Sequence, residues 1–331
     1  MRIIASANQK GGCGKTTTAI NLSYSLSLKG KKVLLIDFDP QAHATIGLNI
    51  KPSDLEKSIY DVITPKKNGF LGIGDILIDI NGKFDLAPSN LILTAIEQEL
   101  SGIEGREDRL FEAIQELKEE YGYDYIIIDC PPSIGHLCFN ALRACDEVII
   151  PIDMSLFSLR GVSKLIEITT LLKNKIGHDV KSRALITMYD RRTRYSRVVL
   201  EKVKEEFGDN VFKTVIRYNI RLRETADIGL PVGDFDKKAI GHEDYENLAE
   251  EIVNLETAGM RQNLNTLNVV QDILQRTEEY MKSSEIEHPI SEMEEPSSYS
   301  LQSNYSKMVE VIATKPADSI YNDEDIKEDL P

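Results

Sequence analysis

Residues 8–17 read NQKGGCGKTT, a glycine-rich stretch between the apolar run 3–7 and a helical pattern over 16–29. Glycines in such a place let backbone N–H groups curl around an anion, and the N-terminus of the following helix adds a partial positive charge. A lysine and a threonine after the last glycine are the residues that a phosphate-binding loop uses for its phosphates and metal ion. The stretch therefore predicts a nucleotide-binding loop rather than a plain glycine turn.

The chemistry of this loop assigns a role to each of its last residues. Lys15 would reach the β- and γ-phosphates, and the Thr16 hydroxyl would ligate Mg²⁺. Backbone N–H groups would surround the phosphates along the loop itself, at Gly11, Gly12, Cys13, Gly14 and Thr17.

Short apolar runs alternate with longer helical patterns as far as residue 257, which is typical of βαβ units and a mainly parallel sheet. The expected strands are 3–7, 32–37, 84–87, 125–129, 147–151, 182–188 and 211–215. The expected helices are 16–29, 106–121, 161–175, 197–207 and 242–256. We expect one domain over 1–257, a three-layer α/β fold of the P-loop NTPase class with a mostly parallel, twisted sheet flanked by helices.

Carboxylates follow two of the expected strands. Asp37 and Asp39 lie in the segment DFDPQ, and Asp129 ends the run YIIID. Ligands of an open parallel sheet bind at the carboxyl ends of the strands, so both segments should converge on the glycine-rich loop. Hydrolysis of a nucleotide needs one carboxylate near Mg²⁺ and another near the attacking water. An Asp after a strand is often only a helix N-cap, but three such elements in this order favour catalysis.

These motifs resemble those of the ParA family of partition ATPases, in the ParA/MinD superfamily. Lys10 stands five residues before Lys15, as in the deviant phosphate-binding loop of that superfamily. The resemblance covers residues 2–256. Other matching segments are DFDPQAHAT at 37–45, LAPSN at 86–90, YDYIIIDCPPSIGHL at 123–137, NAL at 140–142, MYDRRTRYS at 188–196 and VFKTVIRYNIRLRE at 211–224.

The resemblance implies a slow, partner-stimulated ATPase that uses ATP and Mg²⁺ as a switch: the ATP form dimerises face to face, and hydrolysis releases it. Lys10 would cross the dimer interface to the partner's nucleotide and would complete the catalytic set with Lys15 and Asp39. Asp39 would position or activate the hydrolytic water. Asp37 would support the same switch.

The resemblance also assigns residues to the metal and to the rest of the nucleotide. Asp129 would hold Mg²⁺ through water, beside Thr16, and Pro131 and Asn219 would complete the nucleotide site. Family members often read Ile-Pro-Arg-Asn where residues 216–219 of this chain read IRYN. The family's proline usually lies against the adenine, so its absence leaves the base to Asn219 and Tyr218.

A basic patch carries the expectation of DNA binding. Residues 190–224 contain ten basic and six acidic side chains, and such a patch can bind phosphates without reading sequence. The resemblance places Arg192 and Arg221 against nonspecific DNA across the dimer, with Arg194 and Arg223 as neighbouring candidates. A solvated face of mixed charge is the alternative. Nine residues precede Lys10, so no helix-turn-helix is expected there and sequence-specific repression is not predicted.

Charge is unevenly distributed along the chain. The whole chain has 54 acidic and 39 basic residues, a net charge of −15, which alone would disfavour nucleic acid. Residues 255–331 account for −10 of it and the first 254 residues for −5. We expect an amphipathic helix over 258–282, whose mixed charges favour packing or partner binding over lipid, and a disordered acidic tail over 283–331. The tail is either a solvated extension, a docking segment or a DNA mimic that competes for the basic patch.

Other classes are disfavoured by composition. No apolar run approaches the roughly 18 residues that span a bilayer, and the start of the chain leaves no room for a signal peptide. We therefore expect a cytoplasmic, nucleoid-associated protein with no membrane partner. The four cysteines form no CxxC pair and are expected to be reduced and buried.

The expected partners are a second copy of the chain in the ATP state, nonspecific DNA, and a ParB-like or cargo adaptor protein that stimulates hydrolysis. The cargo would be a plasmid, a chromosome or another assembly. The alternative function is a MinD-like or other positioning ATPase that acts through protein partners without DNA.

Overall fold

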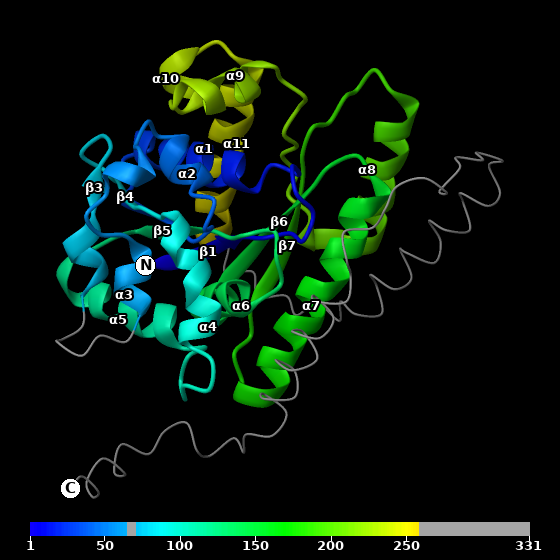
Figure 1. Cartoon of the computed structure of the whole chain (residues 1–331). Coiled ribbons are helices and arrows are strands. Elements are labelled where there is room, and N and C mark those ends of the chain that lie inside the picture. The colour runs from blue at the N-terminus through cyan, green and yellow to red at the C-terminus, as the bar shows by residue number, and fades with distance from the viewer. Residues whose placement is uncertain (65–70, 258–331) are drawn as a thin grey trace, which may run out of the picture.

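The computed structural model describes residues 1–64 and 71–257 (Figure 1). The predicted helix at 258–282 and the predicted acidic tail at 283–331 lie outside the described residues. The strands are β1 (Arg2–Ser6), β2 (Val33–Asp37), β3 (Ile78–Asp79), β4 (Phe84–Ala87), β5 (Tyr125–Asp129), β6 (Glu147–Ile152) and β7 (Lys181–Ile186). The helices are α1 (Lys15–Leu28), α2 (His43–Ile46), α3 (Ile59–Ile63), α4 (Ile96–Glu99), α5 (Arg109–Glu120), α6 (His136–Ala144), α7 (Leu156–Ile176), α8 (Arg194–Phe207), α9 (Arg221–Ile228), α10 (Val232–Phe235) and α11 (Ile240–Thr257).

The sheet brings the ends of the central strands together. Among the described residues it has seven strands in the order β3-β4-β2-β5-β1-β6-β7, and only β3 runs antiparallel. Every residue of β2 (VLLID) and β5 (YIIID) is buried, as expected for strands covered on both faces. Asp129 at the end of β5 is paired in register with Asp37 of β2 and with Ser6 of β1. The polar ends of three strands therefore meet at one edge.

Helices cover both faces of the sheet and give the protein two hydrophobic cores. Figure 1 shows α1, α2, α9, α10 and α11 on one face and α3 to α7 on the other. The first core packs α1 and α11 against the sheet, and the second packs α3, α5, α6 and α7, together with α8. The predicted three-layer α/β fold with a mostly parallel sheet is thus confirmed. None of the helices described here is long and apolar enough to cross a membrane.

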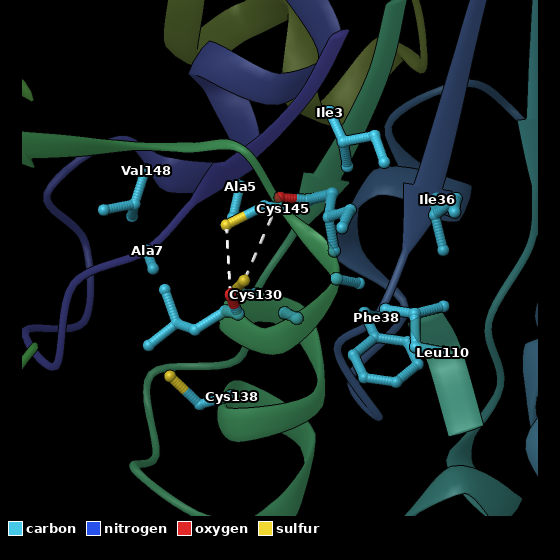
Figure 2. Close-up of a cluster of buried hydrophobic side chains, with 14 of the residues drawn as sticks. Ile3, Ala5, Ala7, Ile36, Phe38, Leu110, Cys130, Cys138, Cys145 and Val148 are labelled. Atoms are coloured by element: carbon cyan, nitrogen blue, oxygen red, sulfur yellow. Dashed lines mark hydrogen bonds between the residues drawn. The ribbon is translucent and has the colours of Figure 1, made fainter. Parts of the chain in front are cut away.

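Three cysteines lie in the second core (Figure 2). The Cys130 thiol, just after β5, is directed at the Ile128 carbonyl at 3.9 Å, and the Cys145 thiol at the Leu142 carbonyl at 3.6 Å. Burial raises the pKa of all three thiols, that of Cys138 to about 12. All four cysteines of the chain are free and buried, which confirms the prediction of reduced, buried thiols.

The strand predicted at 211–215 is wrong. The segment lies beside β7, and the Phe212 amide donates to the Ala184 carbonyl at 3.0 Å. The pairing amounts only to isolated bridges, one of Val211 with Ala184 and another, beyond the segment, of Arg217 with Tyr189. The amides of Lys213 and Thr214 donate instead to the Glu251 carboxylate of α11, at 2.7 and 2.9 Å. A side chain from the neighbouring helix therefore takes the Thr214 amide, which lies between the Phe212 and Ile216 amides that still donate to β7 carbonyls.

Candidate nucleotide-binding site

The glycine-rich loop joins β1 to α1, and its backbone needs glycine at two positions. Gly12 and Gly14 have φ of +73° and +93°, in the left-handed region that a Cβ disfavours. Gly14 is the N-cap of α1, and the first turn of this helix has neither a side-chain cap nor an acidic residue. The N-terminus of α1 therefore offers free N–H donors and the positive end of its dipole to an anion.

The loop is fixed to the strands on one side. The Thr187 hydroxyl, just beyond β7, donates to the Cys13 carbonyl at 2.8 Å. The Asn8 amide donates to the Pro151 carbonyl of β6 at 2.7 Å. The loop thus has a defined shape before any ligand binds, which reduces the entropy lost on binding.

Both lysines of the loop make contacts within the chain. The Lys15 ammonium is buried and donates to the Lys10 carbonyl at 3.0 Å, so it lies over the loop in which phosphates are expected. The Lys10 ammonium is turned away, toward Asp153 and Ser155 after β6. The arrangement agrees with phosphate binding by Lys15 and shows a second, intramolecular environment for Lys10.

Asp129 is a fully buried carboxylate at the end of β5. Neither of its oxygens accepts a hydrogen bond of normal geometry from the described residues. Burial raises the pKa of Asp129 well above its ordinary value, and Asp37 adds to this, while the Thr16 hydroxyl and the Lys15 ammonium oppose it. An unsatisfied buried carboxylate next to a threonine hydroxyl suits a hard cation with oxygen ligands, and Mg²⁺ fits this description.

Asp37 is the second fully buried carboxylate, and Thr45 of α2 satisfies it. The amide and the hydroxyl of Thr45 both donate to Asp37 Oδ2, each at 2.7 Å. Burial raises the pKa of Asp37 to about 6 in spite of these hydrogen bonds. Asp37 therefore holds the segment after β2 in place, in line with a supporting role in the switch.

Asp39 is almost fully buried, and its backbone is held from two sides. Its carboxylate accepts the amide of Gln41 at 2.9 Å, and the His43 ring lies 4.0 Å away. The Ser89 hydroxyl donates to the Asp39 carbonyl at 2.8 Å, and the Ser89 amide donates to the Thr45 hydroxyl at 3.0 Å. Thr45 and Ser89 thus connect the segments after β2 and β4. Sequence reasoning missed both, although each lies in a motif that it had singled out.

The predicted base contact lies on a separate loop beside the end of β7. Asn219 uses its side-chain oxygen to accept the Arg221 amide at 2.8 Å, and Tyr218 is 51% exposed. Asp244 of α11 accepts both the amide and the Nε of Arg217 at 2.8 Å. This loop is therefore anchored through Arg217, at the position where the family often has proline. Pro131 is buried just beyond β5.

Comparisons with known proteins agree with this geometry. A family model described as an AAA domain matches residues 1–182. The sporulation initiation inhibitor protein Soj of Bacillus subtilis is 41% identical over 252 residues, which cover 76% of this chain and 98% of that protein. The chromosome partitioning protein ParA of Myxococcus xanthus is 39% identical over 258 residues, which cover 77% of this chain and 89% of that protein. The chain belongs to the ParA family.

Solved structures support the assignment to this family. A plasmid partition protein of Borrelia burgdorferi has a TM-score of 0.60 and 27% identity, covering 77% of this chain and 98% of that one. Cobyrinic acid a,c-diamide synthase of Mycobacterium smegmatis, solved with an ATP analogue and magnesium, has a TM-score of 0.67 and 30% identity. That match covers 80% of this chain and 100% of the synthase. The ParA-type fold of this chain is thus shared with a protein that binds ATP analogues and magnesium.

The four arginines predicted to contact DNA lie near the beginnings of two helices of this ParA-type domain. All four are exposed: Arg192 and Arg194 at the start of α8, and Arg221 and Arg223 at the start of α9. Arg192 makes a bidentate pair with Asp190 and lowers the pKa of that carboxyl to about 2. Arg221 pairs with Glu224 at 2.6 Å. Two of the four therefore have acidic partners of their own.

Proposed function

We propose that the chain is an ATP-dependent dimerisation switch of the ParA type that binds nonspecific DNA and positions a cargo on the nucleoid. The cargo would be a plasmid, a chromosome or another assembly, and a ParB-like or cargo adaptor protein would stimulate hydrolysis. The observation that carries the proposal is the convergence of the glycine-rich loop with three buried carboxylates at one edge of the sheet. The relatives named as chromosome and plasmid partition proteins support a chromosome or a plasmid as the cargo.

Hydrolysis of ATP is proposed from the placement of these groups. The α1 N-terminus and Lys15 would bind the phosphates, and Asp129 with Thr16 would hold Mg²⁺, which neutralises phosphate charge when bound. Asp39 would orient the attacking water, since its backbone is fixed by Ser89 and its carboxylate lies at the end of β2. Phosphoryl transfer depends mainly on such positioning and on electrostatic stabilisation.

DNA binding is proposed from the charge at two helix starts. Cations at a helix N-terminus oppose the helix dipole, at a cost of about 0.3–1 kcal/mol each. The first turn of α8 has no acidic residue to offset Arg194 and Arg197, and DNA phosphates would supply the missing negative charge. A dimer doubles the number of phosphate contacts, so it would hold DNA that a monomer releases.

A second candidate function has an observation of its own. The pairing of Arg192 with Asp190 and of Arg221 with Glu224 reduces the positive charge that these helices offer to DNA. This favours an ATPase of the same fold that positions an assembly through protein partners without DNA. The two candidates differ in one measurable property, which is ATP-dependent binding to random-sequence DNA.

The test measures binding of the full chain to a random-sequence duplex, with ATP, ADP or no nucleotide, between about 50 and 200 mM salt. We expect binding only with ATP and a steep loss as salt rises. Asp39→Ala should bind ATP and stay on DNA without turnover, and Lys15→Ala should bind no nucleotide. Arg192→Ala/Arg221→Ala should weaken DNA binding, whereas Lys118→Ala, an exposed lysine on α5, serves as the control and should not.

Two outcomes would contradict the proposal. Absence of ATP-dependent DNA binding at low salt would leave the second candidate function. ATPase activity near wild type in Asp39→Ala would remove the proposed role of that residue.

A further inference from the structure

Lys10 is held by two residues of its own chain. Its ammonium forms an ion pair with the Asp153 carboxylate and donates to the Ser155 hydroxyl at 2.6 Å. The Ser155 hydroxyl in turn donates to the other oxygen of Asp153 at 2.7 Å. We call Lys10, Asp153 and Ser155 the lysine latch.

The latch is largely shielded from water and rigidly supported. The side chains of Lys10 and Asp153 are 25% and 13% exposed. Asp153 directly follows β6, and the Ser155 amide donates to the Asp153 carbonyl at 2.7 Å. On the other side, Asn8 accepts the Lys10 amide at 3.1 Å and is itself bound to β6. Both halves of the latch are thus fixed to the same strand end, so little conformational entropy is lost when it closes.

We propose that Asp153 and Ser155 are positioning residues that retain Lys10 in its own subunit until a partner arrives, and that they thereby set the protein concentration at which the ATP-bound dimer forms. The inference rests on the proposed function, in which Lys10 reaches the nucleotide of the partner. The Lys10 ammonium cannot occupy both places, so its ion pair with Asp153 has to break when the dimer closes.

The latch acts twice on the dimer. Each of the two subunits must release its own Lys10, so the free energy of opening enters the dimer dissociation constant once for each subunit. A shielded ion pair with one extra hydrogen bond favours the closed latch by about threefold in each subunit. Removing the latch should therefore tighten the dimer by about tenfold.

The experiment measures dimerisation of the full chain by sedimentation over a series of concentrations, with the non-hydrolysable ATP analogue AMPPNP and Mg²⁺. Asp153→Asn keeps the size of the side chain and removes its charge, so we expect dimers at about tenfold lower protein concentration. Ser155→Ala should shift dimerisation in the same direction by less. Ser155 makes no cap hydrogen bond to α7, so this change removes no helix cap.

Two controls separate the latch from a general change of charge or stability. Asp179→Asn neutralises an exposed carboxylate that pairs with Lys173 at the opposite edge of the sheet, and it should leave dimerisation unchanged. In a Lys10→Ala background, Asp153→Asn should have no effect on dimerisation. A second readout needs no dimer: without nucleotide, a water-soluble acylating reagent should modify Lys10 severalfold faster in Asp153→Asn than in the wild type.

The outcomes distinguish the two hypotheses. A wild-type chain that stays monomeric with AMPPNP at every concentration would overturn the proposed function, and the latch with it. A wild-type chain that dimerises, together with unchanged or weaker dimerisation of Asp153→Asn, would overturn the latch alone. An unchanged rate of Lys10 acylation in Asp153→Asn would do the same.

Discussion

Asp37 and Asp129 put two fully buried carboxylates side by side at the ends of β2 and β5. Thr45 compensates Asp37 with two hydrogen bonds, but neither oxygen of Asp129 accepts a hydrogen bond of normal geometry from the described residues. A buried charge that is only partly compensated destabilises a fold, so this pair costs stability until a cation binds. The protein keeps the pair at the place where Mg²⁺ and phosphates are proposed to bind, a trade of stability for function that is common in such sites.

This arrangement predicts that the nucleotide-free protein gains stability in mild acid. Burial raises the pKa of Asp37 from 3.8 to about 6, so the folded state binds the proton more tightly than the unfolded chain. The contribution of this group to the free energy of unfolding therefore falls as pH rises between these two values and stays low above about 6. Urea unfolding without Mg²⁺ or nucleotide, at several pH values across this range, would measure it.

The variant Asp129→Asn tests whether the buried carboxylates cause this loss of stability. We expect this variant to be more stable than the wild type at neutral pH by about 1–3 kcal/mol, because it removes one of the two buried carboxylates. The difference should shrink as pH falls through the raised pKa of Asp129, where the wild type takes up a proton. Asp179→Asn, at an exposed carboxylate, should follow the wild type at every pH. Equal stabilities of Asp129→Asn and the wild type throughout would contradict this account.

At the scale of single residues, the sequence predicts which groups surround the loop but not what holds them. Asp37 and Asp129 could be placed at one edge because parallel strands end together. The supports Ser89 and Asp153 could not, since their roles depend on contacts with residues about 50 and about 140 positions away in the chain. A serine or aspartate after a strand has no local pattern that distinguishes a support from a cap.

Helix α11 is the element that fixes the loops on its side of the sheet. Glu251 accepts two backbone amides of the segment after α8, and Asp244 holds the loop with Arg217. The carboxylates of Asp244 and Glu243 both contact the Arg217 guanidinium. Both raise the pKa of Arg217, and Asp244 raises it most. One helix thus binds two amides of 211–215 and anchors the loop that is predicted to contact the base.

Asp244 should be worth more to stability than its neighbour Glu243. Asp244→Ala would leave the amide and the guanidinium of Arg217 without their buried acceptor, and we expect a loss of about 1–3 kcal/mol in the free energy of unfolding. Glu243→Ala removes a carboxylate that is 64% exposed and pairs with the same guanidinium at 2.7 Å, so its loss should stay below about 0.5 kcal/mol. Equal losses in the two variants by urea unfolding would contradict this ranking.

At the scale of elements, strong periodicity was predictive and short elements were not. The predicted strands 84–87 and 125–129 match β4 and β5, and the helix predicted at 197–207 begins earlier, at Arg194, because Thr193 caps it. Helices α6 and α9 were missed, because nine and eight residues show too little periodicity to be recognised. Glu251, which accepts two amides of the segment 211–215, lies on a helix that is distant in the sequence. No local pattern could therefore have excluded that strand.

The whole molecule divides its charge between two parts. Residues 1–254 have a net charge of −5, and within them exposed arginines lie at the starts of α8 and α9. Residues 283–331 contain 12 acidic and 3 basic side chains, which give this segment a net charge of −9. An acidic segment on the same chain competes with DNA for a basic surface whenever it can reach that surface, and salt weakens both interactions.

Deletion of residues 283–331 should therefore raise the affinity for random-sequence DNA in the ATP state at low salt. We expect an affinity gain of about threefold to tenfold near 50 mM salt. The gain should fade by about 200 mM, because salt screens the attraction of the basic surface for the tail as well as for DNA. A neutral Gly/Ser segment of equal length is the control, because it keeps the excluded volume of the tail and lacks its charge. If the chain with the neutral tail has wild-type affinity, the segment lowers DNA binding through its excluded volume and not through its charge. If deletion and neutral replacement both leave affinity unchanged, the tail is a solvated extension and autoinhibition by charge is ruled out.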